Sequence, residues 1–351
     1  MKNIRLKPEA RSGLFLVLLF CPVIFLLGSC NQDPLFYDIS NEVKPKEPVI
    51  PGTPTKIVEA GGKLYVSNRT DLFEFSQGSW NRIAGPPGRI TDLASGESGP
   101  YCITEDSRLY SGSGSVWTPV DNQNLEGYTL QSIYGEGGSL FIGASREGDG
   151  YHHYAVFTGS GGAVISGSGE GFRLRGAVSG YFALGNGIYQ ASGGSPLPGS
   201  TGRDILAMIQ LPDNTIAAST KDGHLLYGSG SSFTAVSTGY KFDRALAVYR
   251  GTGGALLLLV GIYTKGYMEL DLGSGGSFPS GRASLKSPGE GVYGVNTTVH
   301  NYPRYNATLG QYALVSLYQS DAKALPLFAS TVGKGLNAYQ ELNEGWQWNA
   351  Y

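Results

Sequence analysis

The residues whose chemistry is most readily assigned are the three cysteines, Cys21, Cys30 and Cys102. Cys21 lies inside an apolar run, and Cys102 lies in the stretch 100–104, whose pattern is typical of a strand. Burial makes a thiol behave as a small hydrophobic group and disfavours the reactive thiolate. We therefore expect Cys102 to be buried and inert. Cys30, which follows two small residues, is the thiol open to modification.

Residues 1–29 are organised like a secretory signal, with four basic residues before the apolar core Leu14–Leu27. That core is short for a membrane span. The sequence Leu27-Gly28-Ser29-Cys30 resembles the lipobox of bacterial lipoproteins, which implies cleavage before Cys30 and attachment of a diacylglyceryl group to its thiol. The alternatives are an ordinary cleaved signal with an incidental cysteine, or a retained helix. With Cys21 removed and Cys30 modified, no internal disulfide is possible.

A lipid on Cys30 would hold the protein in the cell membrane or the outer membrane, facing the periplasm or the cell surface. Asn31 stands where an Asp would resemble an inner-membrane retention signal, which favours the outer membrane. Residues 30–55 form a polar stretch with five prolines, and such segments extend at about 3.1 Å per residue. We interpret it as a tether between the lipid and a domain over 56–351.

Two groups of side chains beyond the anchor are candidate binding residues. His152 and His153 would point to opposite faces of a strand, but on a loop both would be able to face a ligand. A metal site needs three or four convergent ligands, so we predict no metal there. The loop 300–306 carries Tyr302, Arg304 and Tyr305, residue types enriched at binding hot spots. The alternative role for this loop is to pack across one face of the domain.

The remaining patterns argue against several classes of protein. The glycine-rich strings 159–162 and 167–171 are not followed by a helical pattern, so they are turns rather than phosphate loops. Serine, histidine and acidic residues are too dispersed to indicate a catalytic triad, and we predict no cofactor. Removal of the signal takes away four of 26 basic and one of 28 acidic residues, leaving 22 against 27. That mildly acidic chain lacks the basic surface that nucleic acid requires.

The elements of the domain over 56–351 are predicted to be strands. The chain has 53 glycines and 22 tyrosines, and short alternating apolar runs are separated by Gly/Ser turns. A unit of about four strands recurs seven times, at roughly 42 residues per unit. The units begin near Lys56, Ile90, Leu130, Phe182, Ile205, Ala245 and Val292. The Gly112/Gly114 and Gly228/Gly230 pairs are expected to make hairpins that need a positive φ.

A four-stranded sheet cannot bury both faces alone, so repeated sheets pack radially in a β-propeller. We predict an all-β propeller with seven four-stranded blades, and six or eight stay open because the fourth unit is short and the seventh long. The repeat resembles the quinoprotein-like, NHL-like and kelch-like propellers without the signature of any one family. Thr104-Glu105-Asp106 and Thr220-Lys221-Asp222 begin like the Asp-box of sialidase-type propellers, but the glycine two residues later is absent.

Architecture does not fix function. We favour a membrane-anchored envelope lipoprotein whose propeller binds a protein or glycan partner without catalysis. One alternative is a glycan hydrolase or lyase with its site at the mouth of the propeller, which predicts paired carboxylates or a His/Tyr/Arg cluster converging on one face. A surface adhesin is the third hypothesis, and it predicts exposed aromatic side chains on one face.

Overall fold

The computed structural model describes residues 48–121, 125–136, 138–146, 152–158, 163–169, 173–192, 194–250, 256–263, 266–278, 292–293, 309, 312–319, 326–342 and 345–350. Its compact unit spans Glu47–Tyr351. Within these residues, the strands form seven antiparallel sheets, six with four strands and one with three. The part of the chain that the structure describes contains no helix of the length and hydrophobicity needed to cross a bilayer.

The strands follow the chain from sheet to sheet without exchange between sheets. The first three sheets contain β1 (Val58–Ala60), β2 (Lys63–Ser67), β3 (Leu72–Ser76) and β4 (Ser79–Ile83); β5 (Ile90–Ala94), β6 (Tyr101–Thr104), β7 (Leu109–Ser113) and β8 (Val116–Val120); β9 (Tyr128–Glu136), β10 (Ser139–Arg146), β11 (His152–Thr158) and β12 (Ala163–Gly169). The fourth and fifth contain β13 (Leu174–Val178), β14 (Tyr181–Leu184) and β15 (Gly187–Gln190); β16 (Ile205–Gln210), β17 (Ile216–Thr220), β18 (His224–Ser229) and β19 (Ser232–Ser237). The last two contain β20 (Phe242–Arg250), β21 (Leu256–Ile262), β22 (Tyr267–Asp271) and β23 (Val292–Tyr293); β24 (Leu314–Tyr318), β25 (Leu327–Thr331), β26 (Gly335–Leu342) and β27 (Gly345–Ala350).

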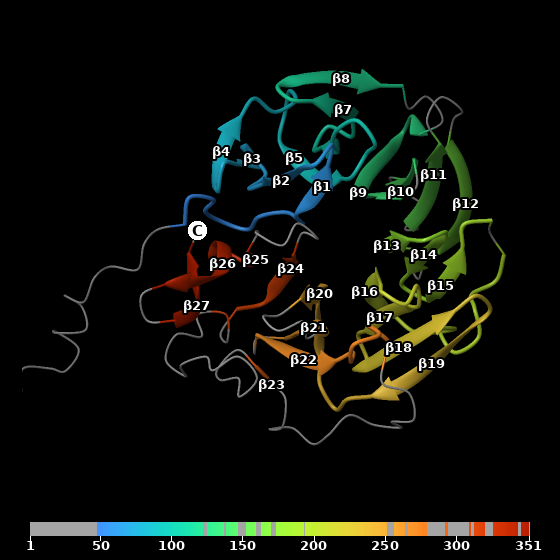
Figure 1. The fold of residues 1–351 in the computed structure, drawn as a ribbon. Helices are drawn as coiled ribbons and strands as arrows, with labels where there is room; N and C mark the ends of the chain where they lie inside the picture. Colours follow the sequence, from blue (N-terminus) through green and yellow to red (C-terminus); the bar gives the residue numbers. More distant parts are fainter. Residues whose placement is uncertain are drawn as a thin grey trace, which may run out of the picture. The chain divides into compact units, whose positions relative to one another are not determined.

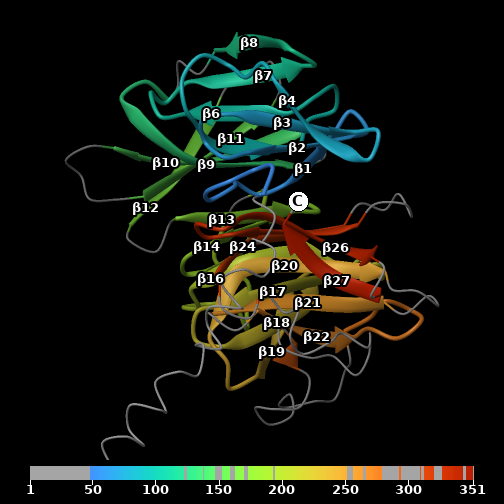
Figure 2. The ribbon, with the colours of Figure 1, turned by 90° about the vertical axis from the view of Figure 1, so that its left-hand side faces the viewer.

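The sheets surround a central axis, with the first strand of each sheet nearest to it (Figures 1 and 2). Successive inner strands contact one another from β5 through β9, β13, β16 and β20 to β24. Seven clusters of buried apolar side chains lie between consecutive sheets, and one of them joins the seventh sheet to the first. Each sheet therefore buries both faces against its neighbours. The predicted all-β propeller is confirmed.

The inner strands share a local irregularity near their first residues. The pairing register with the second strand shifts in β5, β9, β13, β16, β20 and β24. Arg175 lies in the shift of β13, between Leu174 and Gly176, and Arg244 lies in the longer shift of β20. Because a bulge inserts an extra residue and redirects its side chain, these positions differ in direction from the regular strand residues that pack between sheets.

The first and seventh sheets are joined by an aromatic cluster. Phe328 of β25 is fully buried, and its ring centroid lies 5.3 Å from that of Phe75 and 5.4 Å from that of Trp80. The segment before β1 adds backbone contacts, since Ile50 and Gly52 accept hydrogen bonds from Leu336 and Gly335. Residues 48–55, which the sequence analysis counts with the tether, thus pack on the last sheet in this structure.

The fourth sheet has three strands, and the segment after β15 covers its outer edge. The Leu197 amide donates to the Ile188 carbonyl at 2.8 Å, and the buried Ser200 hydroxyl accepts from the Ile188 amide at 3.0 Å. Pro198 also accepts a bond from Phe233 in the fifth sheet. Gly199 permits this approach, because its φ is +81° and a Cβ would lie 1.8 Å from the Phe233 carbonyl oxygen. The missing strand is therefore replaced by a loop bonded to both sheets.

Replacing Ser200 with alanine is expected to reduce the free energy of unfolding by about 1–3 kcal/mol, because the buried Ile188 amide loses its acceptor. The measurement is urea unfolding followed by tryptophan fluorescence. Thr201→Ala is the matched control, since Thr201 is exposed and only makes a 3.4 Å bond to Leu197. Equal stability of the two variants would contradict the role given to the Ser200 hydroxyl.

A carboxyl group lies between the sixth and seventh sheets. Glu269 of β22 pairs with Leu259, which belongs to the apolar cluster joining these sheets, together with Tyr249 and Trp348. Burial raises the pKa of Glu269 from 4.5 to about 8. The folded protein therefore holds this proton over a pH range in which the unfolded chain releases it.

Because the folded pKa of Glu269 is the higher one, its contribution to stability is complete below pH 4.5 and is lost as the pH rises through about 8. We expect Glu269→Gln to remove this loss and to stabilise the protein at pH 8.5 by on the order of 2 kcal/mol relative to the parent. Thermal unfolding of both proteins at pH 5 and pH 8.5 measures the effect. If the difference in Tm between the parent and Glu269→Gln were the same at both pH values, the role given to the Glu269 proton would be contradicted.

Two sequence predictions need correction. The stretch beginning at Val292 was assigned to the seventh unit, but β23 pairs with β22 and completes the sixth sheet. Its short apolar pattern did not show which neighbour it would join. Gly114 and Gly230 have the predicted positive φ, whereas Gly112 and Gly228 do not. The latter two are constrained by contact instead, because a Cβ would lie 2.7 Å from the Trp117 ring and 2.2 Å from the Ser232 carbonyl oxygen, respectively.

Candidate functional site

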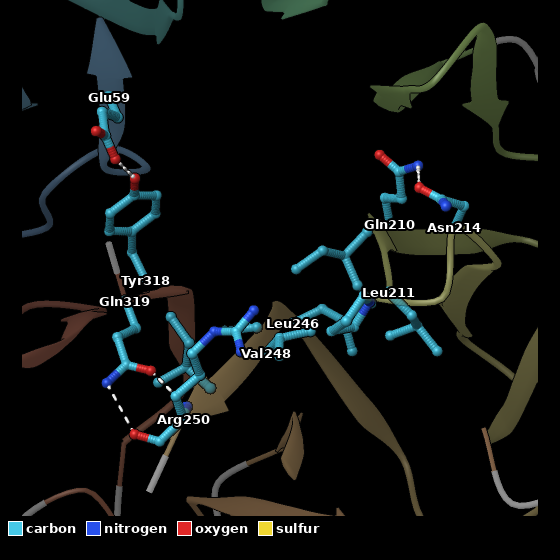
Figure 3. Close-up of a pocket in the computed structure, with 13 residues that line it drawn as sticks. Glu59, Gln210, Leu211, Asn214, Leu246, Val248, Arg250, Tyr318 and Gln319 are labelled. Carbon is cyan, nitrogen blue, oxygen red and sulfur yellow. Dashed lines mark hydrogen bonds between the residues drawn. The ribbon is translucent and has the colours of Figure 1, made fainter. Parts of the chain in front are cut away.

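A pocket of about 410 Å³ lies where the inner strands β1, β16, β20 and β24 end (Figure 3). These are strands of the first, fifth, sixth and seventh sheets. Its polar lining residues are Glu59, Gln210, Asn214, Arg250, Tyr318 and Gln319, and its apolar ones include Ile209, Leu211, Leu246, Val248 and Leu317. In each of these strands a polar residue stands at or next to the last position, namely Glu59, Gln210, Arg250 and Tyr318.

The polar groups of the pocket are held by bonds between different sheets. The Tyr318 hydroxyl donates to Glu59 Oε2 at 2.5 Å, which connects the seventh sheet to the first. The Gln319 side chain accepts from the Arg250 amide at 2.6 Å and donates to the Arg250 carbonyl at 3.4 Å. Gln319 therefore caps the end of β20 from the neighbouring sheet. The backbone of Arg250 is therefore fixed, while the residue itself is exposed.

The opposite wall carries the amides of the fifth sheet. Gln210 Nε2 donates to Asn214 Oδ1 at 3.1 Å across the turn between β16 and β17. Figure 3 shows this pair facing the Glu59–Tyr318 pair across the pocket. Between them, the Leu246 and Val248 side chains form an apolar surface. The arrangement is an apolar floor edged by amide, phenol, guanidinium and carboxylate groups.

The composition of this pocket limits its chemistry. Among its lining residues, Glu59 is the one carboxylate, whereas glycoside hydrolysis uses two carboxyl groups flanking the bond. The described lining residues include no histidine, cysteine or serine. Within the described segments, no group of three His, Cys, Asp or Glu side chains is placed to hold a metal ion. The pocket is therefore equipped for hydrogen bonding and apolar contact.

None of the sequence-predicted site residues is among the described residues that line this pocket. Cys30, Tyr302, Arg304 and Tyr305 lie outside the described residues. His152 and His153 are adjacent positions of β11, opposite Ser145 and Ala144, so they lie on a strand rather than on a loop. Their side chains are outside the described part of the structure.

Glu59, Arg250, Tyr318 and Gln319 were not predicted from the sequence. Glu59 and Arg250 come at or near the ends of apolar runs that the repeat marks as first strands, so aligning the ends of those strands would have grouped these two. Tyr318 and Gln319 would not have been found in this way, because the repeat placed the start of the seventh unit at Val292 and not at β24. Cys102 is fully buried in β6, as predicted, and burial raises the pKa of its thiol, which disfavours the reactive thiolate.

Comparison with known proteins supports the fold and the class of protein. No protein-family profile matches the chain. It is 25% identical over 326 residues to an uncharacterized lipoprotein of Treponema pallidum (strain Nichols), covering 83% of this chain and 80% of that protein. Among solved structures, YCF48 bound to D1 peptide has a TM-score of 0.53 at 10% identity, covering 84% of this chain and 96% of the other. The computationally designed Ika8 protein has a TM-score of 0.52 at 11% identity, covering 84% and 99%.

The two kinds of similarity carry different information. The structural similarities, at such low identity, concern the β-propeller fold alone. The Treponema relative extends over most of both chains and is a lipoprotein, which agrees with the class predicted from the Leu27-Gly28-Ser29-Cys30 sequence.

Proposed function

We propose that this chain is a lipoprotein, anchored in the cell envelope through Cys30, whose propeller binds a polypeptide segment of an envelope partner without catalysis. The observation that carries the binding role is the pocket, where four sheets contribute hydrogen-bonding side chains around an apolar floor. Extended polypeptide offers amide donors and acceptors and apolar side chains together. The side-chain amides of Gln210, Asn214 and Gln319 are suited to hydrogen bonds with the backbone of such a segment. Leu246 and Val248 are suited to contact with its apolar side chains.

The anchor and the pocket support one another in this proposal. A lipid on Cys30 would confine the propeller to a membrane surface, and residues 31–47 would give it reach. A binding module held in this way meets partners that are themselves held in or near the same membrane. The predicted contribution of Tyr302, Arg304 and Tyr305, and that of His152 and His153, stays a prediction.

The pocket is tested with the full lipidated chain, purified in detergent from its own membranes with the proteins bound to it. We expect Arg250→Ala combined with Gln210→Ala to reduce the recovery of a specific partner about tenfold, measured by quantitative mass spectrometry, because both side chains edge the pocket. Arg82→Ala is the control, since Arg82 lies on β4 with its side chain 71% exposed. Partner recovery that is the same for all three proteins would overturn the pocket as the binding site.

The same preparation tests the enzymatic alternative. Envelope glycans are incubated with the parent chain and with Glu59→Gln, which keeps an oxygen acceptor for the Tyr318 hydroxyl but removes the carboxylate. The proposal expects no product from either protein. Glycan cleavage by the parent that is lost in Glu59→Gln would replace the binding role with a catalytic one.

A further inference from the structure

We propose that Arg173, Arg175 and Arg244 form an oxyanion-binding site near the starts of the inner strands, separate from the pocket. Arg175 and Arg244 lie in the register shifts of β13 and β20, and Arg173 immediately precedes β13. Arg244 and Arg250 are six residues apart on the same strand, which at about 3.3 Å per residue places Arg244 up to about 20 Å from Arg250. Leu246, on the floor of the pocket, lies between them in the sequence. The ligand class is a phosphate or carboxylate group.

The first support is the unmet hydrogen-bonding capacity of Arg175. Its side chain is 12% exposed, and its Nε and Nη1 atoms are buried without a hydrogen-bond partner. Its ionic contact with Asp204 runs from Nη2 to Oδ1 at 3.6 Å, longer than a hydrogen bond. A guanidinium presents five donors in a planar fork that matches an oxyanion. Leaving several of them unpaired in a buried position is costly.

The second support is the local excess of positive charge. Burial is the largest cause that lowers the pKa of the Arg175 guanidinium, followed by the charges of Arg244 and Arg173, while Asp204 acts in the opposite direction. Asp204 also lies 3.8 Å from Lys221, so its single charge is shared. The neighbouring Asp243 is 7% exposed and accepts a hydrogen bond from the Leu314 amide at 2.9 Å. Asp204 is therefore a counterion shared by Arg173, Arg175 and Lys221, and Arg244 adds a further positive charge near the two arginines.

Among the described residues, Asp92 and Tyr134 lie near the cluster and do not neutralise it. Asp92 is bound to Lys56 at 2.5 Å and to the Ile133 amide at 3.1 Å. The ring of Tyr134 lies 4.0 Å from Lys56 Nζ, and burial raises the pKa of its hydroxyl, which keeps it uncharged. Arg173 and Arg244 are exposed, so an anion can reach the cluster from solvent.

The test measures binding of inorganic phosphate to the full chain by calorimetry and by thermal shift, at constant ionic strength set with chloride. We expect saturable binding and a rise in Tm for the parent. Arg244→Gln should weaken phosphate binding at least tenfold, and Arg175→Gln should do so as well. Because Arg244 is exposed, its variant is expected to fold even if Arg175→Gln does not. Arg89→Gln, on a 59% exposed side chain between sheets one and two, is the matched control.

Citrate in place of phosphate distinguishes the source of the oxyanion: tighter binding of citrate assigns a carboxylate ligand, and tighter binding of phosphate a phosphate ligand. The site is overturned if phosphate and citrate give no saturable response over chloride, or if Arg244→Gln responds like the parent. Arg250→Ala should bind phosphate normally, because it changes the pocket and not this cluster. Failure of the pocket proposal would thus leave this result unchanged.

Discussion

Replacing Asp92 with alanine is expected to lower the free energy of unfolding by about 3 kcal/mol, the range seen when one partner of a buried ion pair is removed. Asp92 of β5 accepts from Lys56 Nζ at 2.5 Å, and the two side chains are 15% and 22% exposed. The Lys56 ammonium also donates to the Ile133 carbonyl at 2.5 Å. Lys56 precedes β1 and Ile133 lies on β9, so one cation links the first three sheets.

The size of this effect follows from the two groups that lose their partner when Asp92 is replaced, the Lys56 ammonium and the Ile133 amide. Burial lowers the pKa of Lys56, and Asp92 is the group that opposes this by raising it. Without Asp92, the cation keeps its desolvation cost and loses its counterion, and the Ile133 amide loses its acceptor. Two losses are therefore combined in one substitution.

The measurement is equilibrium urea unfolding at pH 7. Glu105→Ala is the control, because its pair with Arg89 has side chains 51% and 59% exposed and is expected to change stability by under about 0.5 kcal/mol. The double variant Lys56→Met with Asp92→Leu should recover part of the loss, since it removes the unpaired cation but leaves the Ile133 amide without its acceptor. A loss for Asp92→Ala no larger than that for Glu105→Ala would show that the linkage between sheets carries little stability.

The repeat was predictable because its physical cause is local. Alternating apolar residues, glycine turns and regular spacing recur in each unit, and a sheet that is apolar on both faces requires neighbours on both sides. Even the short fourth sheet was visible in the sequence, as a unit with fewer apolar runs. What could not be predicted was how its open edge is covered, because that depends on Ser200 and Pro198 bonding to residues distant in sequence.

The candidate site was harder to predict because its residues are ordinary where they stand in the sequence. Glu59 and Tyr318 are 259 positions apart and meet only when the seventh sheet closes against the first. Arg175 and Arg244 share a role through equivalent register shifts, which depend on pairing with the second strand. The residues that sequence reasoning selected, such as Tyr302 and Arg304, were chosen by composition within one loop. Local composition can detect side chains that cluster within one segment of the sequence. It cannot detect side chains that come together only when the sheets of the propeller pack around the central axis.

Replacing Cys30 with alanine is expected to abolish attachment of the protein to the membrane while leaving the propeller folded. Cys30 lies outside the described residues, and within them the first buried residue is Ile50, which packs with the last sheet. The lipid would be carried on the thiol, and a single myristoyl-sized chain already gives only marginal membrane binding. Removing every acyl chain should therefore leave the protein in the soluble fraction.

The measurement combines labelling of the protein with a radioactive fatty acid, fractionation of the envelope, and thermal unfolding of the recovered protein. We expect Cys30→Ala to lose the label and the membrane fraction. Its Tm should stay within about 1 °C of that of the parent, since the buried contacts of the described residues do not involve Cys30. Cys102→Ala is the matched thiol control: it should keep the label, and because Cys102 is fully buried in β6 it should instead lower the Tm. A labelled, membrane-bound Cys30→Ala protein would show that another group carries the lipid. The binding role of the pocket would then have to be tested without assuming a membrane-bound partner.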